Sequence, residues 1–321
     1  MALCGALAVL VMGMSSIVGA QLLTFGILLA YAAGWGLAHS FFLPTQEAML
    51  ADVAGPDLMR AVTVRTLVQF SALALGNLIG GSARWIGTET ALAVQGCVLL
   101  VGLLPFYWIR GVHHEPPRTP SRTLVEIRDG LRTVAASERL RPLTMLVATW
   151  GFFSIGPWFV LVPLMVRDIY HGDVGVLALA MMMFPLGSIL GSTALLLRGG
   201  IHRKGLALVV AFVISASCLA AESLEFPLPV FLALLCGWGV CGSVFLNASR
   251  TLFQEGVPAS QRARVFSVYI LGFMGMAPLG NLASGLVAGW IGAPATCAVA
   301  GLAAIGVTLL VAWRTRIPQM R

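Results

Sequence analysis

The chain has 321 residues, of which 58% are hydrophobic and only 10% are charged, and its formal net charge is +7. A soluble domain carries about 25% charged residues, so this composition excludes an ordinary soluble enzyme or binding module. The apolar runs are continuous and about twenty residues long, as membrane-spanning helices require, whereas barrel strands would alternate apolar and polar residues. We therefore predict an all-α, polytopic membrane helical bundle.

Ten apolar segments follow one another along the chain, and we interpret each as a membrane helix. The first lacks a basic leading region and is followed at once by a second apolar run, which favours a helix over a signal peptide. The segments are residues 2–20, 22–51, 63–81, 91–109, 143–166, 174–197, 206–221, 226–253, 265–289 and 293–313.

The basic residues predict the orientation of these helices. Arg84 and Arg167 fall on one side of the predicted membrane, and the other 18 of the 20 Lys and Arg residues fall on the opposite side. Since Lys and Arg are enriched in cytoplasmic loops, both termini and residues 111–141 are expected to be cytoplasmic, in a multi-pass protein of the inner membrane. The spread of this charge over several short loops excludes a nucleic-acid footprint.

The long polar segment between the fourth and fifth apolar runs contains a second kind of helix. Ser121 can cap its start, and apolar residues recur on one face while Arg122, Arg128 and Arg132 lie elsewhere. This pattern is typical of an amphipathic helix at the cytoplasmic membrane surface. A plain linker between two bundles is equally compatible with it. The apolar face consists of Leu124, Ile127, Leu131 and Val134.

An internal repeat at an offset of 202–205 residues divides the chain into two halves. Because matched segments enter the membrane from the same side, the repeat is parallel. The second half has six segments and the first has four, so two helices would lie upstream of Met1; a mispredicted start, a truncated gene or a true short form would each produce this pattern. The matches include Gly34-Trp35-Gly36 with Gly237-Trp238-Gly239, Leu75-Gly76-Asn77-Leu78 with Leu279-Gly280-Asn281-Leu282, and Trp85-Ile86-Gly87 with Trp290-Ile291-Gly292. We predict an incomplete four-helix half (1–110), a cytoplasmic linker (111–141) and a six-helix half (142–321).

Three stretches in the same order carry a resemblance to a known family. Residues 126–142 are similar to an "E-G-L-R … L-R" pattern, residues 76–81 to "G-P-x-x-G-G" with Asn77 in place of the proline, and residues 258–264 to "P-x-x-x-R-G-R". With the parallel repeat, they resemble the major facilitator superfamily, and within it the drug:proton antiporter branch of macrolide, tetracycline and enterobactin exporters. The resemblance implies a secondary active transporter with ten of an expected twelve helices, and Gly76, Asn77, Gly80 and Gly81 as its antiporter-motif-like residues.

One helical face and its repeat partner are the predicted substrate cavity, because the corresponding helices line the central cavity in the families that the chain resembles. Aromatic side chains there would stack on a bulky amphipathic compound, and His39 could bind or pass a proton. The alternative is that Trp35 and Trp238 are packing residues beside glycines. The face consists of Trp35, His39, Phe42 and Gln46 in the first half, and Trp238, Phe245 and Ser249 in the second.

Four charged residues are the predicted cytoplasmic gate. Glu47 and Arg250 occupy matched repeat positions near helix ends, with Asp52 and Glu255 close by in sequence. An ionisable group costs about 2.5–3.5 kcal/mol at the membrane centre, and a network of opposite charges would offset this cost. The alternative is interfacial snorkelling of separate side chains.

These patterns predict proton-coupled export of a bulky hydrophobic or amphipathic compound, of the drug or siderophore class, and a role in drug resistance. The alternative is an N-terminally truncated remnant without transport activity. No catalytic or metal-binding motif was found, so we expect neither an enzyme nor a cofactor; the six cysteines lie in apolar runs and are interpreted as packing residues. The expected partners are a small-molecule substrate, protons and the lipid bilayer, with the chain as a monomer.

Overall fold

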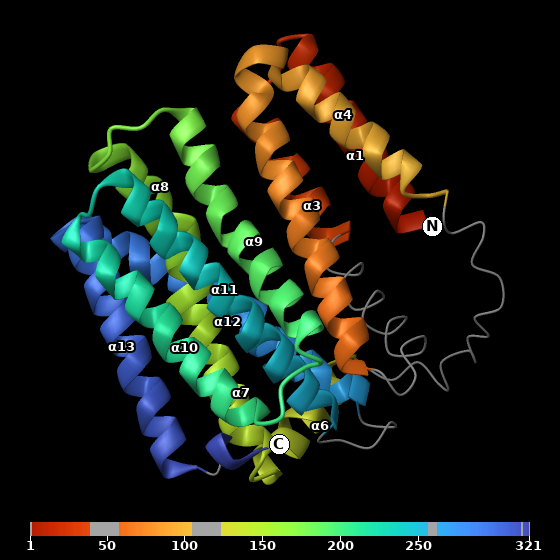
Figure 1. The fold of residues 1–321 in the computed structure, drawn as a ribbon. Coiled ribbons are helices and arrows are strands. Elements are labelled where there is room, and N and C mark those ends of the chain that lie inside the picture. Colours follow the sequence, from red (N-terminus) through yellow and green to blue (C-terminus); the bar gives the residue numbers. More distant parts are fainter. Residues whose placement is uncertain (1, 39–57, 105–122, 256–261, 316, 321) are drawn as a thin grey trace. The chain divides into compact units, whose positions relative to one another are not determined.

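A computed structural model describes residues 2–38, 58–104, 123–255, 262–315 and 317–320 (Figure 1). The described residues are almost entirely helical, and no strand occurs among them. Continuous apolar runs form helices here because a helix pairs its own backbone N–H and C=O groups without help from a solvent. The predicted all-α class is confirmed.

The chain divides into two compact units. The first comprises residues Met1–Val53 and Ile79–Ser121. Within it, α1 (Ala2–Gly19) packs against α4 (Thr88–Val101), and the Ser15 hydroxyl donates a 2.8 Å hydrogen bond to the Glu89 carbonyl. A further apolar helix in this unit spans Phe25–Ala38.

The second unit comprises Ala54–Leu78 and Arg122–Arg321. It holds the first part of α3 (Leu58–Ile86), whose later part belongs to the first unit. Its remaining elements are α6 (Thr123–Ala136), α7 (Leu140–Trp150), η1 (Gly151–Ile155), α8 (Gly156–Asp168), α9 (Val174–Leu197), α10 (Lys204–Ala221), η2 (Glu222–Leu224), α11 (Leu228–Glu255), α12 (Arg262–Ile291), α13 (Ala293–Arg314) and η4 (Ile317–Gln319).

Seven helical stretches among the described residues are long and apolar enough to cross a membrane, and three shorter apolar helices accompany them. One stretch lies in α3 and the other six fill the second predicted half, from Leu140 to Arg314. Parts of the predicted segments 22–51 and 91–109 lie outside the described residues. The number of ten crossings therefore stays a prediction.

The span Leu140–Asp168 is one continuous helix with a widened turn at η1. A π turn of this kind inserts one extra residue into an α-helix. Gly151 begins the turn and Gly156 follows it, and a side chain at either position would collide with the backbone of α12, at Phe273 and Gly280 respectively. The two glycines thus allow this span and α12 to pack backbone to backbone.

The predicted amphipathic helix is present as α6, which contacts α12 and α7. Val134 on its apolar face is buried in the core of the second unit, whereas Leu131 is 44% exposed. Part of the face is therefore covered by protein. Ser121, the predicted cap, lies outside the described residues.

Candidate functional site

The pair α9 and α11 forms the framework of the candidate site. Gly187 on α9 lies against the Cys236 carbonyl, and Gly239 on α11 lies against the Phe184 carbonyl, so that a side chain at either glycine would meet backbone. The Ser188 hydroxyl also donates a 3.0 Å hydrogen bond to the Gly239 carbonyl. Small residues in membrane helices permit this close approach, and they fix which side of α11 faces the interior.

An aromatic cluster fills the interior beside this pair. Its first group consists of Trp150, Phe245 and Phe212. The Trp150 ring on α7 stacks on the Phe245 ring of α11, with ring centroids 4.2 Å apart and an interplanar angle of 11°. Phe212 on α10 lies 4.9 Å from the Trp150 ring and 5.2 Å from the Phe245 ring, centroid to centroid. Such pairs contribute about 0.5–1.5 kcal/mol each beyond the area they bury.

The second group of the aromatic cluster surrounds Trp238. The Trp158 ring lies 5.4 Å from that of Trp238 in an edge-to-face arrangement, and Phe184 lies 5.0 Å from Trp158. Trp238 and Phe245, both predicted to line the cavity, are 1% and 0% exposed. In this conformation they pack in the core, and their contact with a substrate stays a prediction.

Two tryptophans in the aromatic cluster have indole N–H groups that are buried without an acceptor among the described residues. The Nε1 atoms of Trp150 and Trp238 are buried and have no hydrogen-bond partner in the described part of the protein. A buried donor without a partner costs about 1–3 kcal/mol, and a buried Trp usually finds an acceptor. The cluster therefore offers two N–H donors to any polar group that enters it.

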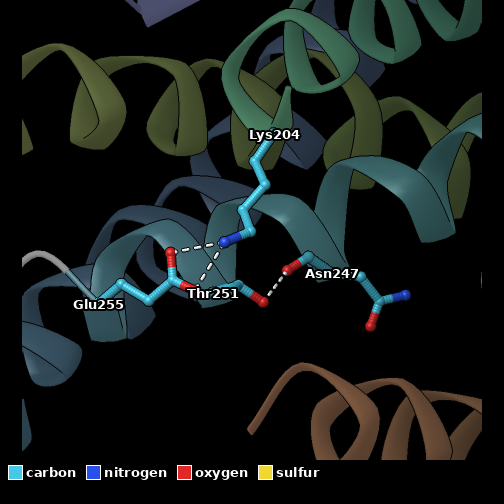
Figure 2. Close-up of polar contacts among 4 residues, drawn as sticks. All are labelled: Lys204, Asn247, Thr251 and Glu255. Carbon is cyan, nitrogen blue, oxygen red and sulfur yellow. Dashed lines mark hydrogen bonds and ion pairs between the residues drawn. The ribbon is translucent and has the colours of Figure 1, made fainter. Parts of the chain in front are cut away.

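Polar side chains continue along α11 toward its C-terminal end. The Thr66 hydroxyl on α3 lies 3.2 Å from Asn247 Oδ1, and Asn247 Nδ2 donates a 2.8 Å hydrogen bond to the Ser243 carbonyl. Thr251 donates to the Asn247 carbonyl at 2.8 Å (Figure 2). Ser249, also predicted to line the cavity, is fully buried, with its hydroxyl 3.2 Å from that of Tyr269.

The predicted gate residues are only partly described. Glu47 and Asp52 lie outside the described residues. Glu255 pairs with Lys204 at the start of α10, with Nζ–Oε distances of 2.7 and 2.8 Å (Figure 2). Arg250 is 7% exposed, and its Nε and Nη1 atoms have no hydrogen-bond partner among the described residues.

Lys204 was not among the predicted site residues. The signal that could have identified it is positional: α10 and α11 are consecutive, so the start of one and the end of the other lie at the same end of the bundle. A Lys in the first position of α10 and a Glu in the last position of α11 are therefore natural partners.

The antiporter-motif-like residues on α3 make one specific contact. Asn77 Nδ2 donates a 3.1 Å hydrogen bond to the Met181 carbonyl on α9. Gly76 and Gly80 have no atom within 4 Å of the place a Cβ would take, whereas Gly280, the repeat partner of Gly76, lies against the Phe152 carbonyl. Gly81 is half-buried. The matched positions of the two repeats are therefore packed differently.

The first-half face of the predicted cavity is described only at its beginning. Trp35 is half-buried, with its ring 6.3 Å from that of Tyr31. His39, Phe42 and Gln46 lie outside the described residues. Their predicted role as a substrate surface is untested.

Both the sequence and the fold are similar to those of known proteins. The sequence matches the Major Facilitator Superfamily over residues 1–274. No curated protein matches it. Among solved structures, the crystal structure of a variant of the E. coli fucose:proton symporter FucP is similar, with a TM-score of 0.61 and 16% sequence identity, over 98% of this chain and 82% of that chain. At this identity the likeness shows the fold alone.

Proposed function

Because the chain belongs to the Major Facilitator Superfamily, we propose that it exports a bulky hydrophobic or amphipathic compound, of the drug or siderophore class, in exchange for protons. Family membership and the apolar helices make the chain a multi-pass membrane protein and a secondary transporter. The direction of transport, the coupling to protons and the class of substrate are the parts that we propose.

The aromatic cluster is the observation that carries the proposed substrate class. Trp238 stands ten residues after the start of α11, which corresponds to about 15 Å along the helix axis and thus to the middle of an apolar layer about 30 Å thick. Flat rings there can stack on a bulky ligand, and the free N–H groups of Trp150 and Trp238 can bind its polar group. A sugar-like ligand would instead need many polar partners at this depth.

The proposed direction of transport is supported by residues 76–81. These residues resemble the antiporter motif, and Asn77 joins α3 to α9 through the Met181 carbonyl. By sequence α3 belongs to the first repeat, yet residues Leu58–Leu78 pack with the second. Alternating access moves one repeat against the other, so contacts of α3 with α9 and α11 must form or break in the transport cycle.

Transport by the purified full chain tests the proposal. The protein is reconstituted into liposomes with an imposed pH gradient, and the movement of a fluorescent, lipophilic cationic dye is followed. We expect dye to accumulate in the compartment with the higher proton concentration, and we expect an ionophore that collapses the gradient to abolish this. Protein-free liposomes are the control.

Two results would contradict the proposal. Dye movement that is unchanged when the gradient is collapsed would exclude proton coupling. An absence of dye and proton movement, in protein that remains monodisperse after reconstitution, would favour a chain without transport activity.

A further inference from the structure

A large cavity lies where α7 begins and α13 ends, away from the aromatic cluster. Its volume is about 1100 Å³. Residues that precede or begin α7 form one wall, the last turns of α13 form the other, and η4 contributes Gln319. The residues that carry the argument are Arg139, Arg141, Met145, Leu310 and Arg314.

The cavity is rich in positive charge. It is lined by three arginines and one acidic residue, Glu138, and none of the three arginines forms an ion pair within the part of the chain that the structure describes. The Nε atom of Arg139 is buried there without a hydrogen-bond partner among the described residues. Guanidinium groups bind phosphate oxygens in strong, charge-assisted hydrogen bonds, and the exposed side chains of Arg141 and Arg314 are accessible to such a ligand. The polar end of the cavity therefore favours a phosphate-bearing anion.

The walls of the cavity become apolar one helical turn away from the arginines. Met145 follows Arg141 by four residues on α7, and Leu310 precedes Arg314 by four residues on α13. Four residues advance a helix by about 6 Å. Met145 and Leu310 remain 50% and 47% exposed, and both stand within helices that are apolar enough to cross a membrane.

This order of groups corresponds to the order in a membrane lipid. The basic residues stand at the ends of spanning helices, where headgroups lie, and the exposed apolar residues stand deeper, where acyl chains lie. A free phosphate would use the arginines but gain nothing from Met145 and Leu310. We propose that the cavity binds one anionic phospholipid, with its phosphate on Arg139, Arg141 and Arg314 and an acyl chain along Met145 and Leu310.

Lipid binding by the purified full chain tests this site. The delipidated protein is titrated with dioleoylphosphatidylglycerol or with the zwitterionic dioleoylphosphatidylcholine, and lipid adducts are counted by native mass spectrometry. We expect one phosphatidylglycerol to bind in preference to phosphatidylcholine. In the R141Q/R314Q variant, we expect its affinity to fall about tenfold or more, because each basic residue contributes about 1 kcal/mol of attraction to an anionic lipid.

A matched control separates this cavity from general surface charge. The R198Q/R203Q variant removes two exposed arginines that do not line the cavity, and we expect it to bind phosphatidylglycerol like the unmodified chain. The R141K/R314K variant keeps the charge and should retain most of the binding. Unchanged binding in R141Q/R314Q, or an equal loss in R198Q/R203Q, would overturn the proposal.

A second arm distinguishes a lipid from a free phosphate. We expect Leu310→Gln to weaken phosphatidylglycerol binding, because it places a polar group beside the acyl chain. We also expect inorganic phosphate in hundredfold excess to leave the lipid bound. Displacement by phosphate, together with normal lipid binding in Leu310→Gln, would show that the cavity recognises a soluble anion and would overturn the lipid site.

Discussion

The Thr66 hydroxyl lies 3.2 Å from the side-chain oxygen of Asn247, and this contact joins α3 to α11 across 181 residues of sequence. Both side chains are fully buried. One turn further along α3, the Phe70 ring lies 5.7 Å from that of Phe184 on α9. The beginning of α3 is thus held to the second repeat by a polar and an aromatic contact.

We expect the Thr66–Asn247 contact to be measurable as a coupling energy. Each of the variants Thr66→Val and Asn247→Ala removes one partner, and a hydrogen bond of this kind contributes about 0.5–1.5 kcal/mol. In a double-mutant cycle on the free energy of unfolding, the double variant should lose less than the sum of the single variants. Additive losses would mean that the two side chains do not interact.

The Lys204–Glu255 pair is expected to contribute little to stability. The side chains are 16% and 40% exposed, and ion pairs that reach solvent contribute about 0.2–1 kcal/mol. We expect Lys204→Glu to lower the unfolding temperature slightly and Lys204→Glu with Glu255→Lys to restore it. High salt should reduce the difference between the single variant and the unmodified chain; a difference that salt does not change would exclude an electrostatic origin.

Arg250 and Glu47 provide a test of the predicted gate. Reversing Glu47 to Lys is expected to reduce transport, and adding Arg250→Glu should partly restore it if the two charges face each other during the cycle. Dye export by cells that express each variant is the measurement. Absence of any rescue in the double variant, at equal protein levels, would exclude a direct pair.

Substitution by alanine should affect the stability of the protein differently at the matched positions Gly76 and Gly280. Gly280→Ala places a methyl group against the Phe152 carbonyl and is expected to destabilise the protein by about 1–3 kcal/mol, as overpacked sites do. Gly76→Ala adds a methyl group where no atom lies within 4 Å, and it should be neutral or stabilise α3 by up to about 1 kcal/mol. Unfolding of both variants in the same detergent provides the comparison.

Tyr170 joins two loops on one side of the second unit. Its hydroxyl donates a 2.7 Å hydrogen bond to the Phe226 carbonyl. Burial raises the pKa of Tyr170 above its usual value, and the carboxylates of Glu222 and Glu225 raise it further. Because the pKa in the folded protein is raised, the stabilisation is complete below the ordinary tyrosine pKa of about 10 and is lost as the pH rises through the folded value.

The variant Tyr170→Phe tests this contact. We expect it to lower the free energy of unfolding by about 1 kcal/mol at neutral pH. The unmodified chain should lose stability above pH ~10 more steeply than the variant, which has no phenol to ionise. Parallel alkaline unfolding curves for the two proteins would contradict this assignment.

The extent of the helices could be predicted more fully than their contacts. The segment 174–197 matches α9 because local signals mark both ends: Asp173 accepts a 3.0 Å hydrogen bond from the Val176 N–H as a cap, and Arg198 ends the apolar run. Such signals act between residues that are close in sequence. The class of fold follows from the length and continuity of the apolar runs.

The candidate site depends on which helices are neighbours, and apolar periodicity carries little information about that. Trp238 has a repeat partner in Trp35, yet it packs against Trp158 of α8, a helix outside the matched blocks of the two repeats. Lys204 likewise gains its role only from the fold of α10 against α11. The predicted cavity residues Trp238, Phe245 and Ser249 do lie on one helix, but they are buried by contacts with other helices, namely α7, α8, α9, α10 and α12.

The widened turn at η1 determines how side chains before and after it are oriented around the axis of the span Leu140–Asp168. Trp150 and Trp158 are eight residues apart, and in an uninterrupted α-helix they would point about 80° away from each other. One residue absorbed by the π turn reduces this difference to about 20°. The turn thus brings the two tryptophans to the same side of the helix. From that side Trp150 stacks on Phe245 and Trp158 contacts Trp238.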